Sequence, residues 1–77
     1  MIKELDTVVL EAELAEHGLK RGDIGTVVLL HGEMGYEVEF VSLTGETLAV
    51  VSLKSNQVRP LGAREIAQAR PLEPAAG

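Results

Sequence analysis

The sequence has no cysteine and no tryptophan, and it contains one tyrosine, one phenylalanine and two histidines. The lack of cysteine excludes a disulfide, and a structural zinc ion would need histidine and carboxylate ligands alone. A chain of 77 residues forms one small domain that buries only about 60% of the surface exposed by its unfolded form. Because neither a disulfide nor a zinc site supplements this small core, we expect self-association to add to its stability.

The chain also lacks a basic excess and a long apolar run. Residues 1–61 hold ten of the twelve acidic residues and five of the seven basic ones, so the net charge of −5 belongs to that part. A negative field opposes binding to nucleic acid or to an anionic membrane. No secretory signal is visible at the N-terminus, and no run approaches the roughly 18 apolar residues that span a bilayer. We therefore expect a cytoplasmic protein with protein partners, and neither nucleic acid nor membrane.

Short runs rich in Val, Leu, Ile and Thr follow one another at a spacing of roughly ten residues, which indicates an all-β sandwich or barrel. The third run is the clearest, because apolar and acidic residues alternate from Tyr36 to Phe40, as in a strand with one buried face. The runs predict strands over Thr7–Leu10, 25–30, Tyr36–Val41, Thr47–Leu53 and Val58–Pro60.

The second and fourth runs are apolar on both faces, which is the pattern of strands covered on both sides. Two explanations remain open: a partner protein covers the outward side chains, or the chain's own loop over 11–21 or its tail covers them. We predict a protein interface with an apolar part and an acidic rim, formed by Val28, Leu30, Ala49 and Val51 and by Glu11, Glu13 and Glu16, respectively.

The connections have the composition of turns. Residues 12–17 are expected to form one helical turn that Gly18 ends, and residues 54–57 a second one. Gly45 supplies the positive φ of a tight hairpin turn. After Leu61 the composition changes, so we separate a barrel domain, 1–61, from a tail, 62–77. In the tail, residues 63–70 favour two helical turns that Pro71 stops, and residues 73–77 are expected to be disordered.

The predicted order of elements is that of an SH3-like barrel: a strand, a long loop, three strands joined by hairpins, a helical turn and a short fifth strand. Two segments carry this resemblance, GLKRGDIGTV at 18–27 and SNQVRPL at 55–61. The first also resembles the G-D-x-G-x-V core of KOW-type barrels. Gly22 and Asp23 suit a turn, and Gly25 permits a bulge or a close backbone approach.

Over residues 2–61 the chain resembles a bacterial family of domains of unknown function, number 4926. The matching segments are IKELDTVVL at 2–10, EHGL at 16–19, GDIGTVV at 22–28, YEVEF at 36–40 and QVR at 57–59. The resemblance implies an SH3-like barrel of bacterial or archaeal origin, without an established activity. It also implies a likeness in outline to the barrel of nitrile hydratase β subunits and a genomic association with small toxin–antitoxin proteins. The tail after Leu61 lies beyond the shared pattern.

The residues for enzyme chemistry are few, so we predict no catalytic residue, no cofactor and no metal. A metal site would need His17 and His31 to meet with Glu16 or Glu33, whereas loop histidines more often bond locally or remain solvated. The paired carboxylates in the third strand, Glu37 and Glu39, are better explained as residues that keep its outer face solvated than as an acid–base pair.

The sequence favours a non-enzymatic protein-interaction module that self-assembles, binds a partner protein, or does both. The partner would be a neighbouring gene product, with this chain as its antitoxin-like or accessory component. Two alternatives stay open. One is a KOW-like barrel that binds nucleic acid or the ribosome through Lys20, Arg21, Lys54 and Arg59. The other, which rests on fold analogy, is an accessory subunit of a nitrile-hydratase-like enzyme.

Overall fold

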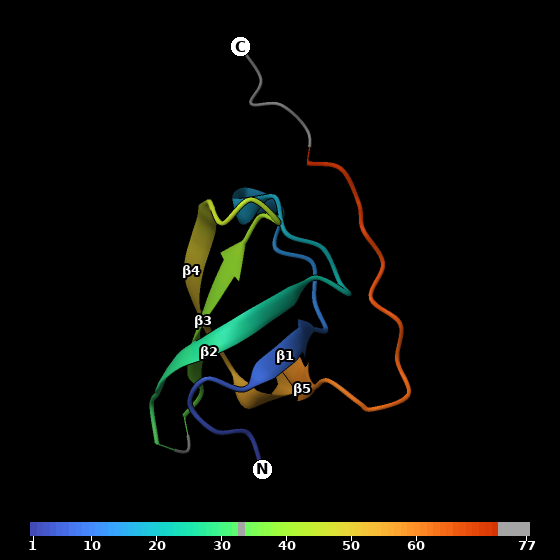
Figure 1. Cartoon of the computed structure of the whole chain (residues 1–77). Helices are drawn as coiled ribbons and strands as arrows, with labels where there is room; N and C mark the ends of the chain where they lie inside the picture. The colour runs from blue at the N-terminus through green and yellow to red at the C-terminus, as the bar shows by residue number, and fades with distance from the viewer. Residues whose placement is uncertain (33, 73–77) are drawn as a thin grey trace.

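The computed structural model describes residues 1–32 and 34–72. It confirms an all-β fold of five antiparallel strands in one strongly curved sheet with the order β4-β3-β2-β1-β5 (Figure 1). The strands are β1 (Thr7–Leu10), β2 (Ile24–Leu30), β3 (Tyr36–Val41), β4 (Thr47–Leu53) and β5 (Val58–Pro60). Four of them have the predicted bounds, and β2 begins one residue earlier than expected. The prediction for residues 73–77 lies outside the described residues.

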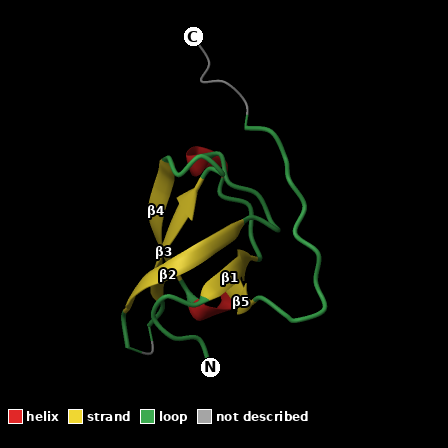
Figure 2. Ribbon diagram, viewed as in Figure 1, coloured by secondary structure: helices red, strands yellow, loops and turns green. Residues whose placement is uncertain are grey.

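Two 3-10 turns lie at opposite ends of the sheet, as Figure 2 shows. The first, η1 (Ala15–His17), ends at Gly18, which has a left-handed φ of 69°. Glycine adopts this conformation at little cost because it has no Cβ atom. The second, η2 (Ser55–Gln57), leads directly into β5. Both turns were predicted, although the first covers only the second half of the predicted range 12–17. Within the described residues, no helix has the length and apolar character needed to cross a membrane.

The core is formed by apolar side chains on the concave side of the sheet. Phe40 is 2% exposed, and Val8, Leu10, Val27 and Val38 are fully buried. The strand register explains this: Val38 of β3 lies between Val27 of β2 and Val51 of β4, so the three side chains share the inner face. No charged or polar residue of the described chain is buried. Burial of these apolar side chains is therefore what stabilises the sheet.

The close backbone approach expected at Gly25 is present. A Cβ atom at this position would lie 2.6 Å from Cγ1 of Val38 and 2.9 Å from Cε1 of Phe40. Because real Cβ atoms do not approach neighbours so closely, any larger residue would push β2 away from the core. Gly25 thus lets β2 cross tightly over the aromatic centre of the barrel.

The tail leaves the sheet after β5 and runs back along the outside of the barrel (Figure 1). It is extended apart from a turn at 63–64, and the two helical turns predicted over 63–70 are not observed. The Glu65 side chain instead accepts hydrogen bonds from the Gly62 N–H and from Arg59, which draw this segment toward β5. Eight residues gain too little from helix formation to resist such contacts.

Candidate functional site

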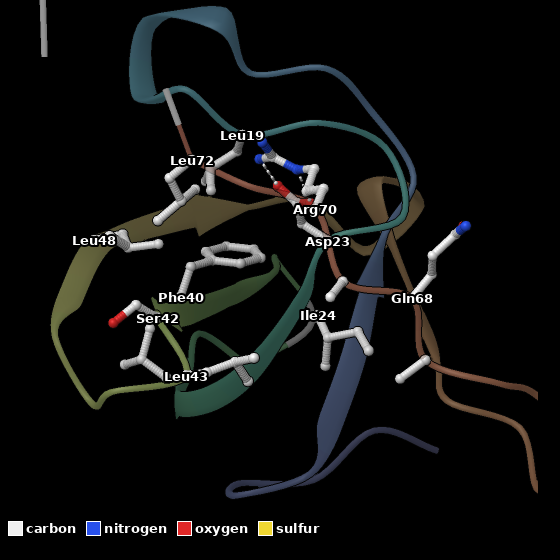
Figure 3. Close-up of a pocket in the computed structure, with 13 residues that line it drawn as sticks. Leu19, Asp23, Ile24, Phe40, Ser42, Leu43, Leu48, Gln68, Arg70 and Leu72 are labelled. Atoms are coloured by element: carbon white, nitrogen blue, oxygen red, sulfur yellow. Dashed lines mark hydrogen bonds and ion pairs between the residues drawn. The ribbon is translucent and has the colours of Figure 1, made fainter. Parts of the chain in front are cut away.

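A groove lies between the barrel and the tail (Figure 3). The space between the two parts has a volume of about 490 Å³, within the range of small-ligand pockets. Phe40 lies in the middle of the lining residues in Figure 3, and tail residues form part of the wall. The barrel side is mostly apolar, with Leu19, Ile24, Phe40, Val41, Leu43 and Leu48, and the tail contributes residues 67–70 and Leu72.

Asp23 is the acidic group of this groove, and the turn before β2 fixes its position. Its Oδ2 accepts a hydrogen bond of 2.8 Å from the Lys20 N–H, and its own N–H donates to the Lys20 carbonyl at 3.0 Å. The Asp23 carbonyl in turn accepts the Leu10 N–H at 2.8 Å, which ties the turn to β1. The barrel therefore orients this carboxylate independently of the tail.

Arg70 of the tail binds Asp23 through two parallel hydrogen bonds. Its Nε donates to Oδ1 at 2.8 Å and its Nη2 to Oδ2 at 2.6 Å, and Nη2 also donates to the Gly18 carbonyl at 3.0 Å. Such forked contacts are stronger and more directional than single ones. Partial burial raises the pKa of the Asp23 carboxyl, but the bonds from Arg70 and Lys20 and their charges outweigh it and lower the pKa overall. The ionised carboxylate is thus the favoured form in the groove.

A second attachment holds the beginning of the tail. Arg59 of β5 donates from Nη1 and Nη2 to the Glu65 carboxylate at 2.7 and 2.8 Å. The bond from Arg59, followed by that from the Gly62 N–H, lowers the pKa of Glu65 to about 2. This pair is exposed to solvent, so its energetic weight is small. It serves to set the course of the chain toward the groove.

The structure separates the residues predicted at an apolar contact. Ala49 and Val51 are half-buried and pack against the core, because β4 turns these alternate positions inward. Val28 is half-buried at the point where the β2–β3 register shifts, and Leu30 is 41% exposed near the end of β2. The outward apolar position of β4 is Val50, which is 53% exposed. Sequence alternation alone does not reveal which of two apolar faces is the outer one.

The predicted acidic rim lies along the connection between β1 and η1. Glu11 is half-buried, and its Oε1 lies 3.6 Å from Nε of Arg59. Glu13 and Glu16 are exposed. Glu13 lines a second pocket of about 960 Å³, which shares Leu19, Leu48, Arg70 and Leu72 with the groove and extends to Glu46. Only Glu13 of the three therefore lies near the groove.

His31 and the carboxylates of β3, Glu37 and Glu39, have side-chain partners. Nε2 of His31 lies 2.7 Å from Oε2 of Glu37, which also accepts a hydrogen bond from the Ser52 hydroxyl. The bond from Ser52, and then that from His31, lowers the pKa of Glu37. His17 lies in η1. Across residues 1–32 and 34–72, no group of three or more His, Asp or Glu side chains is arranged to hold a metal; Glu33 lies outside this part.

Sequence reasoning missed the pairing of Asp23 with Arg70. Asp23 was recognised only as a turn residue, and Arg70 only as part of a helix-forming tail. The two are 47 positions apart, and no periodicity relates a turn to a segment beyond the last strand. The available signal was the Gly-Asp-x-Gly turn itself, which marks a carboxylate that the backbone holds in place.

The fold and groove define a small all-β domain with an additional C-terminal segment packed against it. The chain matches the profile of the domain of unknown function DUF4926 over residues 4–60, and it belongs to that family. Neither a curated protein nor a solved structure matches the chain. Asp23 lies inside the matched region, whereas Glu65, Arg70 and Leu72 lie beyond it. The groove is thus lined on one side by the family domain and on the other by a segment that lies outside the matched residues.

Proposed function

We propose that this protein is a non-enzymatic protein-interaction module that holds an extended polypeptide segment in the groove. One observation carries the proposal: the barrel already holds such a segment, since its own tail lines the groove with Arg70 bound to Asp23 (Figure 3). A segment from a partner protein can take the same place if it offers the same chemistry.

The groove recognises two features that lie close together in a peptide. Its polar end presents the preoriented Asp23 carboxylate, which fits a guanidinium fork. Leu48 of the barrel and Leu72 of the tail line the apolar part of the groove. The Leu72 side chain is 45% exposed. A peptide with an arginine followed two residues later by an apolar residue, as in Arg70 and Leu72, can bind the Asp23 carboxylate and the apolar part at the same time. Forked polar contacts then supply specificity, and apolar burial supplies affinity.

The placement of the basic residues favours a protein partner over nucleic acid. Arg59 is engaged by Glu65 and by Glu11, so its charge is already compensated. Lys20 lies beside Asp23. Arg21 and Lys54, which lies between β4 and η2, are exposed and have no ion pair within the described chain, so two cations of the predicted set remain uncompensated. A surface that gains affinity by neutralising phosphates needs uncompensated positive charge. The groove, by contrast, offers negative charge and an apolar floor.

The proposal is tested with a fluorescent peptide of the sequence of residues 64–72 and the full-length protein. In the unmodified protein the tail competes with the peptide at high effective concentration. We expect Arg70→Ala to weaken the tail's hold and to increase peptide affinity by about tenfold, measured by anisotropy and by amide shifts around Asp23 and Leu48. Arg64→Ala is the matched control, because Arg64 is an exposed arginine of the same tail.

Adding Asp23→Asn to the Arg70→Ala protein is expected to remove the gained affinity, since the amide cannot replace the ionised carboxylate. Equal peptide affinity of the parent and Arg70→Ala proteins would contradict the proposed groove function. Peptide affinity that does not change when Asp23→Asn is added would contradict it as well. The absence of any amide shift at a peptide concentration of about 1 mM would also contradict the proposed function.

A further inference from the structure

Within residues 1–32 and 34–72, strand β4 forms an open edge of the sheet. It spans the seven residues Thr47–Leu53 and pairs with β3 alone. Among the described residues, no turn or loop makes a backbone hydrogen bond to it from the other side. In Figure 1 it lies at the outer left of the sheet. The opposite edge, β5, has three residues and ends on Pro60, which cannot donate a ladder hydrogen bond.

The composition of β4 is unusual for an edge strand. Its sequence, TLAVVSL, contains no charged residue and no proline. Soluble proteins protect edges with charges, prolines, short strands or bulges, because an open edge pairs with other chains. The only such device here is a register irregularity near Leu48, which leaves the part from Ala49 to Leu53 regular. A regular, uncharged edge of this kind is suited to pairing with another strand.

The residues that flank β4 identify the partner. Glu46 precedes the strand and Lys54 follows it, each four positions from Val50. Both side chains are exposed, and within the described chain neither has an ion pair. We propose that two copies of this protein pair antiparallel through β4 about a two-fold axis at Val50. Glu46 of each copy then lies near Lys54 of its partner, beyond the irregularity at Leu48 and just outside the strand, at both ends of the new ladder.

The register follows from sheet geometry. In an antiparallel pair, opposite residues point to the same face, so a symmetric pairing can shift only in steps that keep inner and outer faces matched. The neighbouring registers would move Glu46 toward Ser52 of the partner, or Lys54 toward its Leu48, and so away from the opposite charge. Centring on Val50 satisfies both charges. It also sets apolar Val50 against its own copy, where a charged residue would repel itself.

The net charge of the chain, −5, favours this strand over other surfaces as the place where two copies meet. Two acidic domains repel each other, and a contact between uncharged strands flanked by opposite charges reduces that cost. Pairing of β4 with β5 of a second copy would give rings or open chains. A three-residue strand ending in proline offers too few ladder bonds for that arrangement. The contact therefore closes as a dimer.

The first test is sedimentation equilibrium of the full chain from about 1 μM to 1 mM, with two matched lysine variants. The substituted residues, Val50 and Leu29, have similar exposure, 53% and 49%, and both side chains lie on the outer face of the sheet. Val50 belongs to the edge strand β4, whereas Leu29 belongs to β2, which has a neighbouring strand on each side. We expect Val50→Lys to raise the dimer dissociation constant by at least about tenfold, because two ammonium groups meet at the axis. Leu29→Lys should leave the dimer intact.

The second test is charge reversal at the strand ends. Glu46→Lys and Lys54→Glu each place like charges opposite one another and are expected to weaken the dimer by about two- to tenfold. The double variant restores opposite charges and should return the dissociation constant to about that of the parent. A monomeric parent protein throughout the concentration range would overturn the proposal. Unaltered dimerisation with Val50→Lys, a double variant without recovery, or assemblies larger than two would do so as well.

Val50 lies outside the groove residues, whereas Leu48 of the same strand lines the groove, so separate readouts distinguish the two proposals. Peptide binding by the Val50→Lys protein reports on the groove, while the dissociation constant of the Asp23→Asn protein reports on the strand.

Discussion

The barrel and the tail are held in place by different forces. In the barrel, nine apolar side chains are at most 6% exposed, and every strand is hydrogen-bonded to at least one neighbour. In the described tail, 62–72, no residue is buried. Its side chains reach the barrel through two ionic contacts, Glu65 on Arg59 and Arg70 on Asp23. The sheet therefore depends on the burial of apolar surface, and the position of the tail depends on charge.

This difference indicates how the groove can work. A segment held by exposed or partly exposed ion pairs is weakly bound and is screened by salt. The tail can leave without disturbing the core, because none of the core residues belongs to it. Asp23 keeps its orientation from Lys20 and Leu10 when the tail departs. These contacts are what the proposed groove function requires, with the barrel as the receptor and the tail as an occupant that a partner segment replaces.

The largest expected effect comes from truncating one apolar side chain in each region. Leu10 is fully buried, whereas Ile66 in the tail is 95% exposed. We expect Leu10→Ala to lower the free energy of unfolding by about 2–5 kcal/mol through lost burial and a residual cavity. Ile66→Ala should change it by less than about 0.5 kcal/mol. Urea denaturation followed by circular dichroism measures both. A comparable loss with Ile66→Ala would show that the tail belongs to the cooperative core.

The sequence predicted the barrel well because local signals and burial agree there. Alternation from Tyr36 to Phe40 marks a strand with one buried face, and Gly18 and Gly45 mark turns; both glycines have positive φ. The absence of charge in Thr47–Leu53 was visible as well. These features act over a few residues, which is the range that a sequence pattern can report.

The groove was beyond sequence reasoning because it depends on a contact distant in the chain. Helix propensity in residues 63–70 is weak compared with the contacts that Glu65 and Arg70 make with the barrel. The inward direction of Ala49 and Val51 likewise follows from their pairing with β3. Where a strand is apolar on both faces, only its neighbours determine which face is buried.

A smaller effect is expected from breaking the contact that closes the groove. Asp23→Asn keeps the shape of the side chain but removes the charge that Arg70 binds. The side chains of Asp23 and Arg70 are 17% and 31% exposed, so we expect a loss of about 1 kcal/mol or less in unfolding free energy. Heteronuclear NOE values over residues 66–72 should fall, and raised salt should have the same effect on the parent protein.

Glu16→Gln is the control for this variant, because it neutralises an exposed carboxylate in η1 without touching the groove. Tail NOE values that remain high in the Asp23→Asn protein would contradict a charge-held tail. They would place its attachment in the apolar contacts of Leu72.

The smallest effect on stability is expected at Glu65, where the consequence is a dependence on pH. The pKa of this carboxyl is about 2 in the folded protein, below its ordinary value of 4.5, chiefly because of the bond from Arg59. A carboxyl whose pKa is lowered on folding favours the attached state above its ordinary pKa, and this contribution is lost as the pH falls. The first attachment of the tail should therefore weaken between about pH 4.5 and 2.

The carbon-13 shift of the Glu65 carboxyl measures this directly. We expect a midpoint near 2 in the parent protein, and a midpoint displaced toward 4.5 in Arg59→Gln. Glu37 is an internal control, because its pKa is lowered by Ser52 and His31 on another part of the barrel and should not respond to the variant. If the Glu65 midpoint stays low without Arg59, the Gly62 N–H alone holds the carboxylate. The tail would then be anchored to itself at this point, and Arg70 would be the one charged contact left to tie its described part to the barrel.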